Sequence, residues 1–217
     1  MEERRRTHGV SLLSKALAQH CNTLGIDYDE QWVPGIEEHL ALLQKWAPKI
    51  NLSSVTEPTQ ALVRHVVDSL SLLQLSAFQD ARGQAADVGS GAGFPGIPLA
   101  IALPHLDWTL VEPRGKRGAF LNQVIFGTGI SNCEWFNGRV PHPELASRFE
   151  LVVSRATFAP IELIDQVDFM IVEKGALVVM AAVKPKWELP DHWQLEQACE
   201  FVLDGAPRWV AALRKQI

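Results

Sequence analysis

The sequence has no long apolar run, few cysteines and no excess of positive charge. A membrane-spanning helix needs about 18 or more consecutive apolar residues, and no such run occurs. The charged N-terminus is followed by no apolar segment of the signal-peptide type. The three cysteines, Cys21, Cys133 and Cys199, lie far apart and lack the spacing of a zinc site. We therefore expect a cytoplasmic protein with no membrane segment and no metal.

The balance of charge excludes a broadly basic nucleic-acid-binding surface. The formal net charge is −5, and residues 1–80 and residues 81–217 each carry more acidic than basic side chains. Any contact with nucleic acid must therefore depend on a local cluster of cations. The length of 217 residues and the hydrophobic content of 47% suit one large domain with a smaller appendage.

The chain changes character near residue 80. Apolar residues before it recur at helical spacing, so we predict a helical extension over residues 1–80. Predicted strands and helices then alternate over residues 81–217, which indicates an α/β domain with a mainly parallel sheet and an antiparallel C-terminal hairpin. The predicted helices are residues 12–21, 29–48 with a cap at Asp29, 58–75, 95–103, 116–127 and 160–168. The predicted strands are residues 85–88, 108–112, 132–136, 149–154, 175–182, 193–203 and 208–214, with the hairpin turn at 204–207.

The helix predicted over residues 58–75 carries a group of polar residues beside its apolar side. Leucines and valines spaced three and four apart would face the interior. The surface would then hold Arg64, His65, Asp68 and Ser69. His65 and Asp68 are close enough in a helix to touch. A local surface pair is the more usual outcome of this spacing, and a catalytic dyad is the alternative.

A glycine-rich turn between a predicted strand and a predicted helix is the most informative stretch. It reads Asp87-Val-Gly-Ser-Gly-Ala-Gly-Phe-Pro-Gly96. Glycines let the backbone approach a ligand closely and adopt positive φ. A dinucleotide fingerprint would need a further glycine where Phe94 stands. The pattern instead resembles the first motif of S-adenosylmethionine-dependent methyltransferases. We therefore predict that Asp87, Gly89 and Gly91 bind this cofactor, with the acidic side chain near its sulfonium.

Glu112 ends the second predicted strand of the domain. A carboxylate at this place can accept hydrogen bonds from both hydroxyls of a bound ribose. The alternative is an exposed charge at a strand end. The glycine turn upstream favours the ribose contact, and we predict that Glu112 binds the cofactor.

Cations follow the carboxyl ends of several predicted strands. In an open α/β sheet, ligands bind beyond those ends. The cations in question are Arg114, Lys116, Arg117, Arg139, Arg155, Lys184 and Lys186. A single surface cation is usually just solvated, but the whole set at one edge indicates a phosphate-bearing substrate.

Two motifs that methyltransferases use on other targets are missing from the sequence. No Asn/Asp-Pro-Pro-Tyr/Phe segment is present to hold an exocyclic amine. No cysteine follows a strand directly after proline or threonine, as methylation of a pyrimidine carbon-5 would need. A ring nitrogen with an exposed lone pair needs neither group, and nitrogen-7 of guanine is such a target.

Five stretches, in this order, resemble the signature of the bacterial glucose-inhibited division protein B family. They are Asn51-Leu-Ser-Ser-Val-Thr56, Arg64-His65-Val-Val-Asp68-Ser69-Leu70, the glycine turn with its continuation to Leu99, Gly115-Lys116-Arg117 with Phe120-Leu121, and Ser154-Arg155-Ala156. Members of that family are guanine-N7 methyltransferases of small-subunit (16S) ribosomal RNA. The resemblance implies a Rossmann-like methyltransferase fold and S-adenosyl-L-methionine as cofactor. It also implies the small ribosomal subunit as partner in rRNA processing, and we expect a monomer.

The resemblance further implies roles for particular residues. Contacts with the cofactor would come from Gly89, Phe94, Glu112, Val140 and Pro141. The family often has an acidic residue where Pro141 stands, so only a backbone contact with the adenine is expected there. The reaction centre would hold Arg139 and Arg155, the latter also near the cofactor. Contacts with the substrate RNA are expected from Arg64, His65, Lys116, Arg117 and Lys184.

Two other functions remain open. A methyltransferase of a small molecule would suit the acidic net charge. A ribosome-assembly factor with the same fold and no turnover would belong to a different class. Binding of S-adenosylmethionine separates the assembly factor from the two enzymes, and methyl transfer to ribosomal RNA separates the two enzymes from each other.

Overall fold

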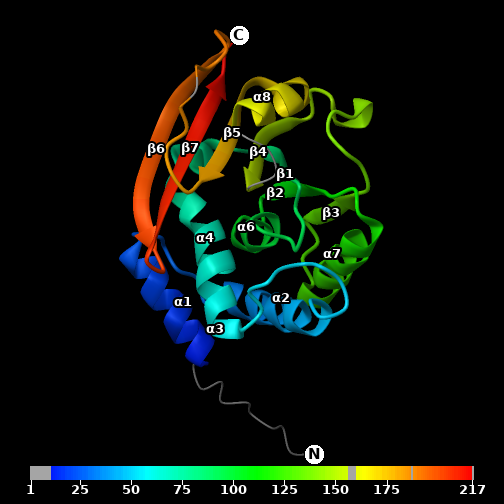
Figure 1. Cartoon of the computed structure of the whole chain (residues 1–217), viewed down its shortest axis with the longest axis vertical. Helices are drawn as coiled ribbons and strands as arrows, with labels where there is room; N and C mark the ends of the chain where they lie inside the picture. Colours follow the sequence, from blue (N-terminus) through cyan, green and yellow to red (C-terminus); the bar gives the residue numbers. More distant parts are fainter. Residues whose placement is uncertain (1–10, 156–159, 187, 217) are drawn as a thin grey trace, which may run out of the picture.

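A single sheet forms the centre of the molecule. The computed structural model describes residues 11–155, 160–186 and 188–216, and the motif residue Ala156 lies outside them. Within the described residues the sheet has seven strands, in the order β3-β2-β1-β4-β5-β7-β6 (Figure 1). β1 to β5 run parallel, and β7 is antiparallel to β5 and β6, which confirms the predicted α/β fold and its C-terminal hairpin. The strands are β1 (Gly83–Val88), β2 (Leu106–Val111), β3 (Cys133–Phe136), β4 (Phe149–Arg155), β5 (Ile171–Ala181), β6 (Trp193–Leu203) and β7 (Ala206–Lys215).

Buried small and branched residues make β1 suitable for the middle of the sheet. Ala85, Ala86 and Val88 are at most 2% exposed, as expected for a parallel strand that is covered on both faces. β1 pairs with β2 on one side and with β4 on the other. The strand order therefore reverses at β1. Such a reversal opens a crevice beyond the carboxyl ends of the strands, where open α/β sheets bind ligands.

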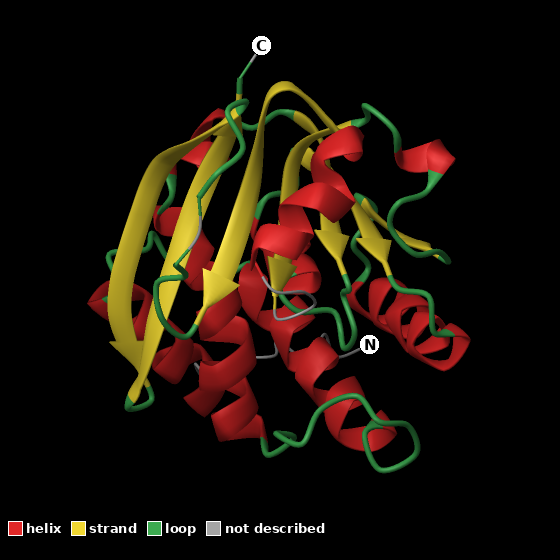
Figure 2. Cartoon of the chain, turned by 45° about the horizontal axis from the view of Figure 1, so that its top comes forward, coloured by secondary structure: helices red, strands yellow, loops and turns green. Residues whose placement is uncertain are grey.

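Helices cover both faces of the sheet (Figure 2). On one face α6 and α7 pack with α1 and α2 in a hydrophobic cluster that includes Leu43, Ile97 and Phe120. On the other face α8 packs in a cluster that includes Val152 and Leu163. These helices are α1 (Leu12–Thr23), α2 (Trp32–Trp46), α6 (Gly96–Ala102), α7 (Gly115–Thr128) and α8 (Pro160–Val167), with the 3₁₀ turns η3 (Pro143–Leu145) and η4 (Asp168–Met170). The N-terminal helices thus share a core with α6 and α7. The domain boundary at residue 80 stays a prediction.

The helix predicted over residues 58–75 is present but irregular. It consists of α3 (Pro58–Ala61), the π-helical η1 (Leu62–Val67), α4 (Asp68–Leu70) and the 3₁₀ η2 (Ser71–Gln74), and α5 (Ser76–Asp80) follows it. Asp68 and Ser69 are only 5% and 0% exposed, so the prediction that they lie on the surface was wrong. A π-helical turn winds more slowly than an α-helix. The residues after it therefore face a different side than regular α-helical spacing predicts.

The second helix begins later than its predicted cap. α2 starts at Trp32, and Gln31 precedes it without a side-chain capping bond. The Asp29 carboxylate instead accepts a hydrogen bond from the backbone N–H of Gln31 at 2.9 Å. Asp29 therefore orders the turn that leads into the helix.

The C-terminal hairpin turns more tightly than predicted. Its turn consists of Asp204 and Gly205, with φ of 52° and 71°. Positive φ at both positions is typical of the type I′ turn, whose twist matches that of paired strands. β7 therefore begins at Ala206, and Arg208 lies within the strand rather than at its predicted first residue.

Candidate active site

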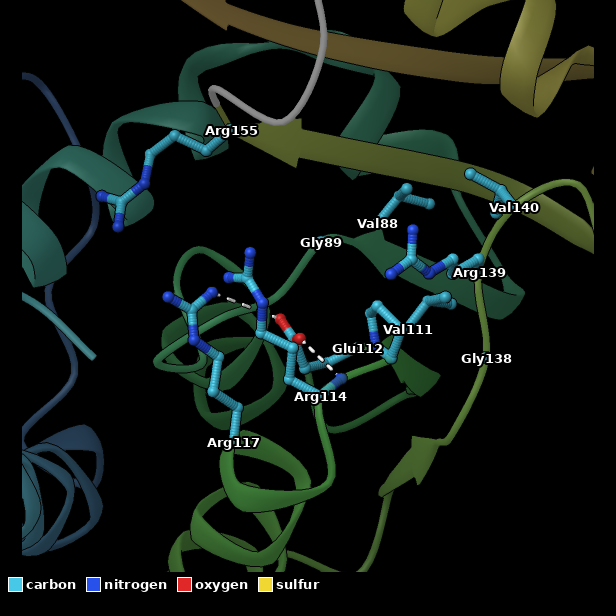
Figure 3. Close-up of a pocket in the computed structure, with 11 residues that line it drawn as sticks. Val88, Gly89, Val111, Glu112, Arg114, Arg117, Gly138, Arg139, Val140 and Arg155 are labelled. Carbon is cyan, nitrogen blue, oxygen red and sulfur yellow. Dashed lines mark hydrogen bonds and ion pairs between the residues drawn. The ribbon is translucent and has the colours of Figure 1, made fainter. Parts of the chain in front are cut away.

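A pocket of about 550 Å³ lies at the carboxyl ends of the parallel strands (Figure 3). Val88 pairs with Val111, and Val111 pairs with Phe136. This register aligns the ends of β1, β2 and β3, so the residues after them meet at one edge of the sheet. The pocket is lined by Val88, Gly89, Val111, Glu112, Pro113, Arg114, Arg117, Gly138, Arg139, Val140 and Arg155.

The pocket brings together predicted site residues from separate stretches of the sequence. Those in its lining are Gly89, Glu112, Arg114, Arg117, Arg139, Val140 and Arg155. The other predicted residues lie outside its lining, and they are Asp87, Gly91, Phe94, Pro141, Arg64, His65, Lys116, Lys184 and Lys186. The exposed ones among these are Pro141, Arg64, Lys116, Lys184 and Lys186.

Positive φ angles shape the glycine turn under the pocket. Gly89, Gly91 and Gly93 have φ of 78°, 56° and 86°, values that favour glycine over residues with a Cβ. The backbone N–H of Gly89 donates to Val111 O at 2.9 Å. Ser90 Oγ donates to Asp87 O at 2.8 Å. These bonds fix the first half of the turn directly against the end of β2.

Asp87 lies beneath the turn and is fully buried. Its Oδ2 accepts the backbone N–H of Gly96, at the start of α6, at 2.9 Å. Within the described part of the chain, Oδ1 has no hydrogen-bond partner. Burial raises the pKa of Asp87 from 3.8 to about 7, against the opposing effect of the Gly96 bond. The geometry makes Asp87 a support of the turn, and its contact with a cofactor stays a prediction.

The raised pKa of Asp87 predicts an unusual pH dependence of stability. The folded protein holds this proton between the unfolded value of 3.8 and about 7, so the contribution of Asp87 to the unfolding free energy should fall as pH rises through that window, and the curve of a variant without it should rise relative to wild type. Asp87→Asn cannot titrate and should lack this fall. Urea unfolding of both proteins between about pH 4.5 and pH 8 measures the difference. Asp107→Asn, at an exposed position on β2, is the control and should keep the wild-type slope. Parallel curves for wild type and Asp87→Asn would contradict the prediction.

Glu112 joins the glycine turn to the start of α7. Its Oε2 accepts the N–H of Gly91 at 3.1 Å, and its Oε1 accepts the N–H of Arg114 at 2.9 Å. The residue is only 3% exposed, although it lines the pocket. In Figure 3, dashed lines join the Glu112 carboxylate to the backbone of Arg114 and to the guanidinium of Arg117. Each carboxylate oxygen can accept more than one hydrogen bond, so both retain capacity for ligand hydroxyls.

Arg117 is tied to the protein more firmly than the sequence suggested. Its Nη2 and Nε donate to Asn51 O at 2.8 and 3.2 Å, and its Nη1 lies 3.7 Å from Glu112 Oε2. The side chain is 21% exposed. Arg117 therefore links the connection after α2 to the wall of the pocket. By contrast, the neighbouring Lys116 is exposed.

Arg139 and Arg155 lie on different sides of the pocket. Arg139 is exposed and follows β3, while the Arg155 side chain is 23% exposed and ends β4. In Figure 3 the Arg155 guanidinium turns toward the N-terminal helices and away from Arg139. Val140, next to Arg139, contributes to the lining and is half-buried.

Phe94 is enclosed by two histidines from the N-terminal helices. Its ring stacks on His39 at 4.4 Å and on His65 at 4.8 Å between centroids. The Arg155 guanidinium lies 5.5 Å from the centre of the same ring. Phe94 itself is 3% exposed. The end of the glycine turn thus packs between α2, η1 and β4.

Both histidines are neutral at physiological pH. Burial lowers the pKa of His39 and of His65 to about 4. His39 Nε2 lies 2.8 Å from Ala92 O, and His65 Nε2 lies 2.9 Å from Ser53 Oγ. Sequence reasoning missed His39 because its partner lies far along the chain. Among the described residues, Asp68 pairs with Arg155 and Arg208 rather than with His65.

The described residues contain no group of three His, Cys, Asp or Glu side chains that could hold a metal ion. They also include no helix long and apolar enough to cross a membrane. The expectation that the protein uses no metal stays a prediction.

Relatives of the chain show its family. The family model described as GidB, rRNA small subunit methyltransferase G, matches residues 33–214. A Burkholderia mallei protein named Ribosomal RNA small subunit methyltransferase G is 32% identical over 206 residues, which is 91% of this chain and 90% of the relative. The chain belongs to the GidB family. A Burkholderia thailandensis protein of the same name is also 32% identical, over 85% of this chain and 83% of its own.

Solved structures support the fold. TrmN from Thermus thermophilus has a TM-score of 0.52 at 17% identity, over 71% of this chain and 53% of its own. The N-methyltransferase NodS from Bradyrhizobium japonicum has a TM-score of 0.53 at 18% identity, over 69% of this chain and 94% of its own. The matched GidB region, residues 33–214, includes the whole pocket lining and the described strands up to the penultimate residue of β7.

Proposed function

We propose that the chain transfers a methyl group from S-adenosyl-L-methionine to nitrogen-7 of a guanine in 16S ribosomal RNA. One observation carries the proposal: in a chain of the GidB family, the glycine turn and Glu112 form the wall of a pocket at the carboxyl ends of β1 and β2. This combination suits a nucleoside whose ribose hydroxyls meet a carboxylate.

The pocket residues fit such a cofactor. Gly89 lets the backbone approach the ligand, and Glu112 offers acceptors to the ribose hydroxyls. Val140 would pack near the adenine. Bound S-adenosylmethionine would supply a methyl group on a sulfonium, which the guanine nitrogen attacks through its lone pair without loss of a proton. The chain therefore needs no general base for this step.

The two arginines would position the RNA. Nitrogen-7 becomes positively charged as it gains the methyl group, so a guanidinium directly against it would oppose the reaction. We therefore assign Arg155 and Arg139 to guanine oxygen-6 or to an adjacent phosphate, both of which accept paired hydrogen bonds from arginine. Correct orientation of reacting groups can supply about 7–11 kcal/mol of barrier reduction. The enzyme would act in the cytoplasm, as a monomer and without a metal.

Transfer of a labelled methyl group tests the function. Calorimetry should show binding of S-adenosylmethionine, and purified small subunits or protein-free 16S RNA should become labelled, with the label on guanine nitrogen-7 by mass spectrometry. Binding without transfer to either RNA substrate would favour a small-molecule methyltransferase. Absence of cofactor binding would favour an assembly factor without turnover.

Lys116 and Arg117 should differ when each is replaced by alanine. Lys116 is exposed, so Lys116→Ala should weaken RNA binding by a few fold, and less so as salt is raised. Arg117 bonds to Asn51 O and lies beside Glu112, so Arg117→Ala should also weaken S-adenosylmethionine binding. Filter binding of RNA at several salt concentrations and calorimetry with the cofactor measure the two effects. Equal loss of cofactor affinity in both variants would contradict the distinction.

A further inference from the structure

Asp68 lies between two arginines from distant parts of the chain. Its Oδ1 accepts a hydrogen bond from Arg208 Nε, on β7, at 2.7 Å. Its Oδ2 lies 3.4 Å from Arg155 Nη1, at the end of β4. The Asp68 side chain is 7% exposed. A carboxylate this buried needs paired cations and hydrogen bonds to offset its desolvation, and the two arginines supply them.

Three groups from other described residues lie close to the Arg155 guanidinium. Asp68 Oδ2 is at 3.4 Å, Arg64 O is at 3.5 Å, and the Phe94 ring centre is at 5.5 Å. Asp68 is the anion among these three, and its carboxylate is carried by a short side chain in the middle of a helical run. Asp68 therefore offers Arg155 an anchor that cannot move far.

We propose that Asp68 is a positioning residue that holds the Arg155 guanidinium against Phe94 at the edge of the methyl-transfer pocket. The inference rests on the proposed function, because Arg155 is assigned there to the RNA. A long arginine side chain loses rotamer entropy when it is fixed. When Arg155 is already paired with Asp68, this entropy is lost during folding and not when the RNA binds for reaction. Because Arg155 is assigned to the RNA, the pair should raise the rate of methyl transfer more than the affinity for the cofactor.

The competing explanation is that Asp68 only joins the helical run to the C-terminal hairpin through Arg208. The two explanations predict different behaviour for Arg208→Gln. This variant removes the bond to Oδ1 and leaves the pair between Asp68 and Arg155 in place. If Asp68 only links the helical run to the hairpin, Arg208→Gln should reproduce the effect of Asp68→Asn. If it positions Arg155, Arg208→Gln should leave turnover within about threefold of wild type.

Single-turnover methyl transfer to small subunits at saturating RNA gives the kinetic test. We expect Asp68→Asn to lower the rate about tenfold or more, with the dissociation constant for S-adenosylmethionine changed by less than about threefold. In an Arg155→Gln background, Asp68→Asn should have little further effect, since its target is gone. Additive losses in the double variant, or losses equal to those of Arg208→Gln, would overturn the proposal.

A second measurement uses the wild-type protein and needs no methyl transfer. The side-chain Nε–H signal of Arg155 is assigned in ¹⁵N-arginine-labelled protein by its absence from Arg155→Lys. Its order parameter should exceed that of Arg114, an exposed arginine of the same pocket, and should fall in Asp68→Asn but not in Arg208→Gln. Equal mobility of Arg155 and Arg114 in the wild type would refute the positioning role. If wild-type enzyme labels no RNA, the proposed function fails, while this measurement still decides the role of Asp68.

Discussion

Arg155→Lys is expected to lower single-turnover methyl transfer to small subunits by about a hundredfold, even at saturating RNA. Lysine keeps the charge but loses the planar fork that allows paired hydrogen bonds and stacking on a ring. In this protein the fork faces the carboxylate of Asp68 and lies over Phe94. The lysine ammonium is a point charge without a flat face, so it cannot pair with Asp68, stack on Phe94 and contact the RNA at the same time.

The matched control for this variant is Arg148→Lys. Arg148 bonds to Gln84 and Glu134, and all three residues lie outside the lining of the candidate pocket. Its replacement should leave the rate near wild type. Cofactor affinity should change only a few fold in Arg155→Lys, and the loss of rate should persist at low salt, where a purely electrostatic contact is strengthened. Near-normal rates for Arg155→Lys would mean that the residue supplies charge alone.

Glu112→Ala should weaken binding of S-adenosylmethionine by about 1.5–3 kcal/mol, the range of hydrogen bonds to a charged group. This corresponds to roughly 10- to 150-fold in the dissociation constant. The variant removes the proposed ribose acceptor together with the acceptor for the N–H groups of Gly91 and Arg114. Calorimetry at constant pH measures the loss directly.

Two further variants separate these contributions. Glu112→Gln keeps one carbonyl acceptor, so it should lose less affinity than Glu112→Ala. Glu134→Ala removes an acidic side chain that is 62% exposed and pairs with Arg148, outside the pocket lining. It should bind the cofactor normally. A loss confined to RNA affinity in Glu112→Ala, with cofactor binding intact, would show that the residue has a different role.

Local pattern was sufficient to predict the sheet and the centre of the pocket. The alternation of strands and helices after residue 80 implied a parallel sheet, and the sheet register then brings Gly89 and Glu112 to one edge. Both residues directly follow buried strands, so their location depends on the strand ends alone. Neither requires knowledge of how distant segments pack.

Residues that depend on distant packing could not be placed from sequence. Asp68 was expected on the surface because regular α-helical spacing was assumed, and the π-helical η1 before it alters that spacing. Arg117 was expected among the cations at the edge of the sheet. Its guanidinium instead donates a hydrogen bond to Asn51 O, in a connection without regular structure. His39 meets Ala92 and Phe94 only after the helical extension has packed on the turn.

The stacking of Phe94 between His39 and His65 limits how this enzyme can be rebuilt from parts. The phenyl ring belongs to the glycine turn, whereas both imidazoles belong to the N-terminal helices. A chimera that joins the first 80 residues of one relative to the sheet of another would need matching surfaces at this stack. Truncation of the helices would uncover a buried aromatic ring beside the pocket. The helical extension is therefore not an interchangeable module. A substitution of Phe94 and a substitution of the histidines that stack on it should be inherited together.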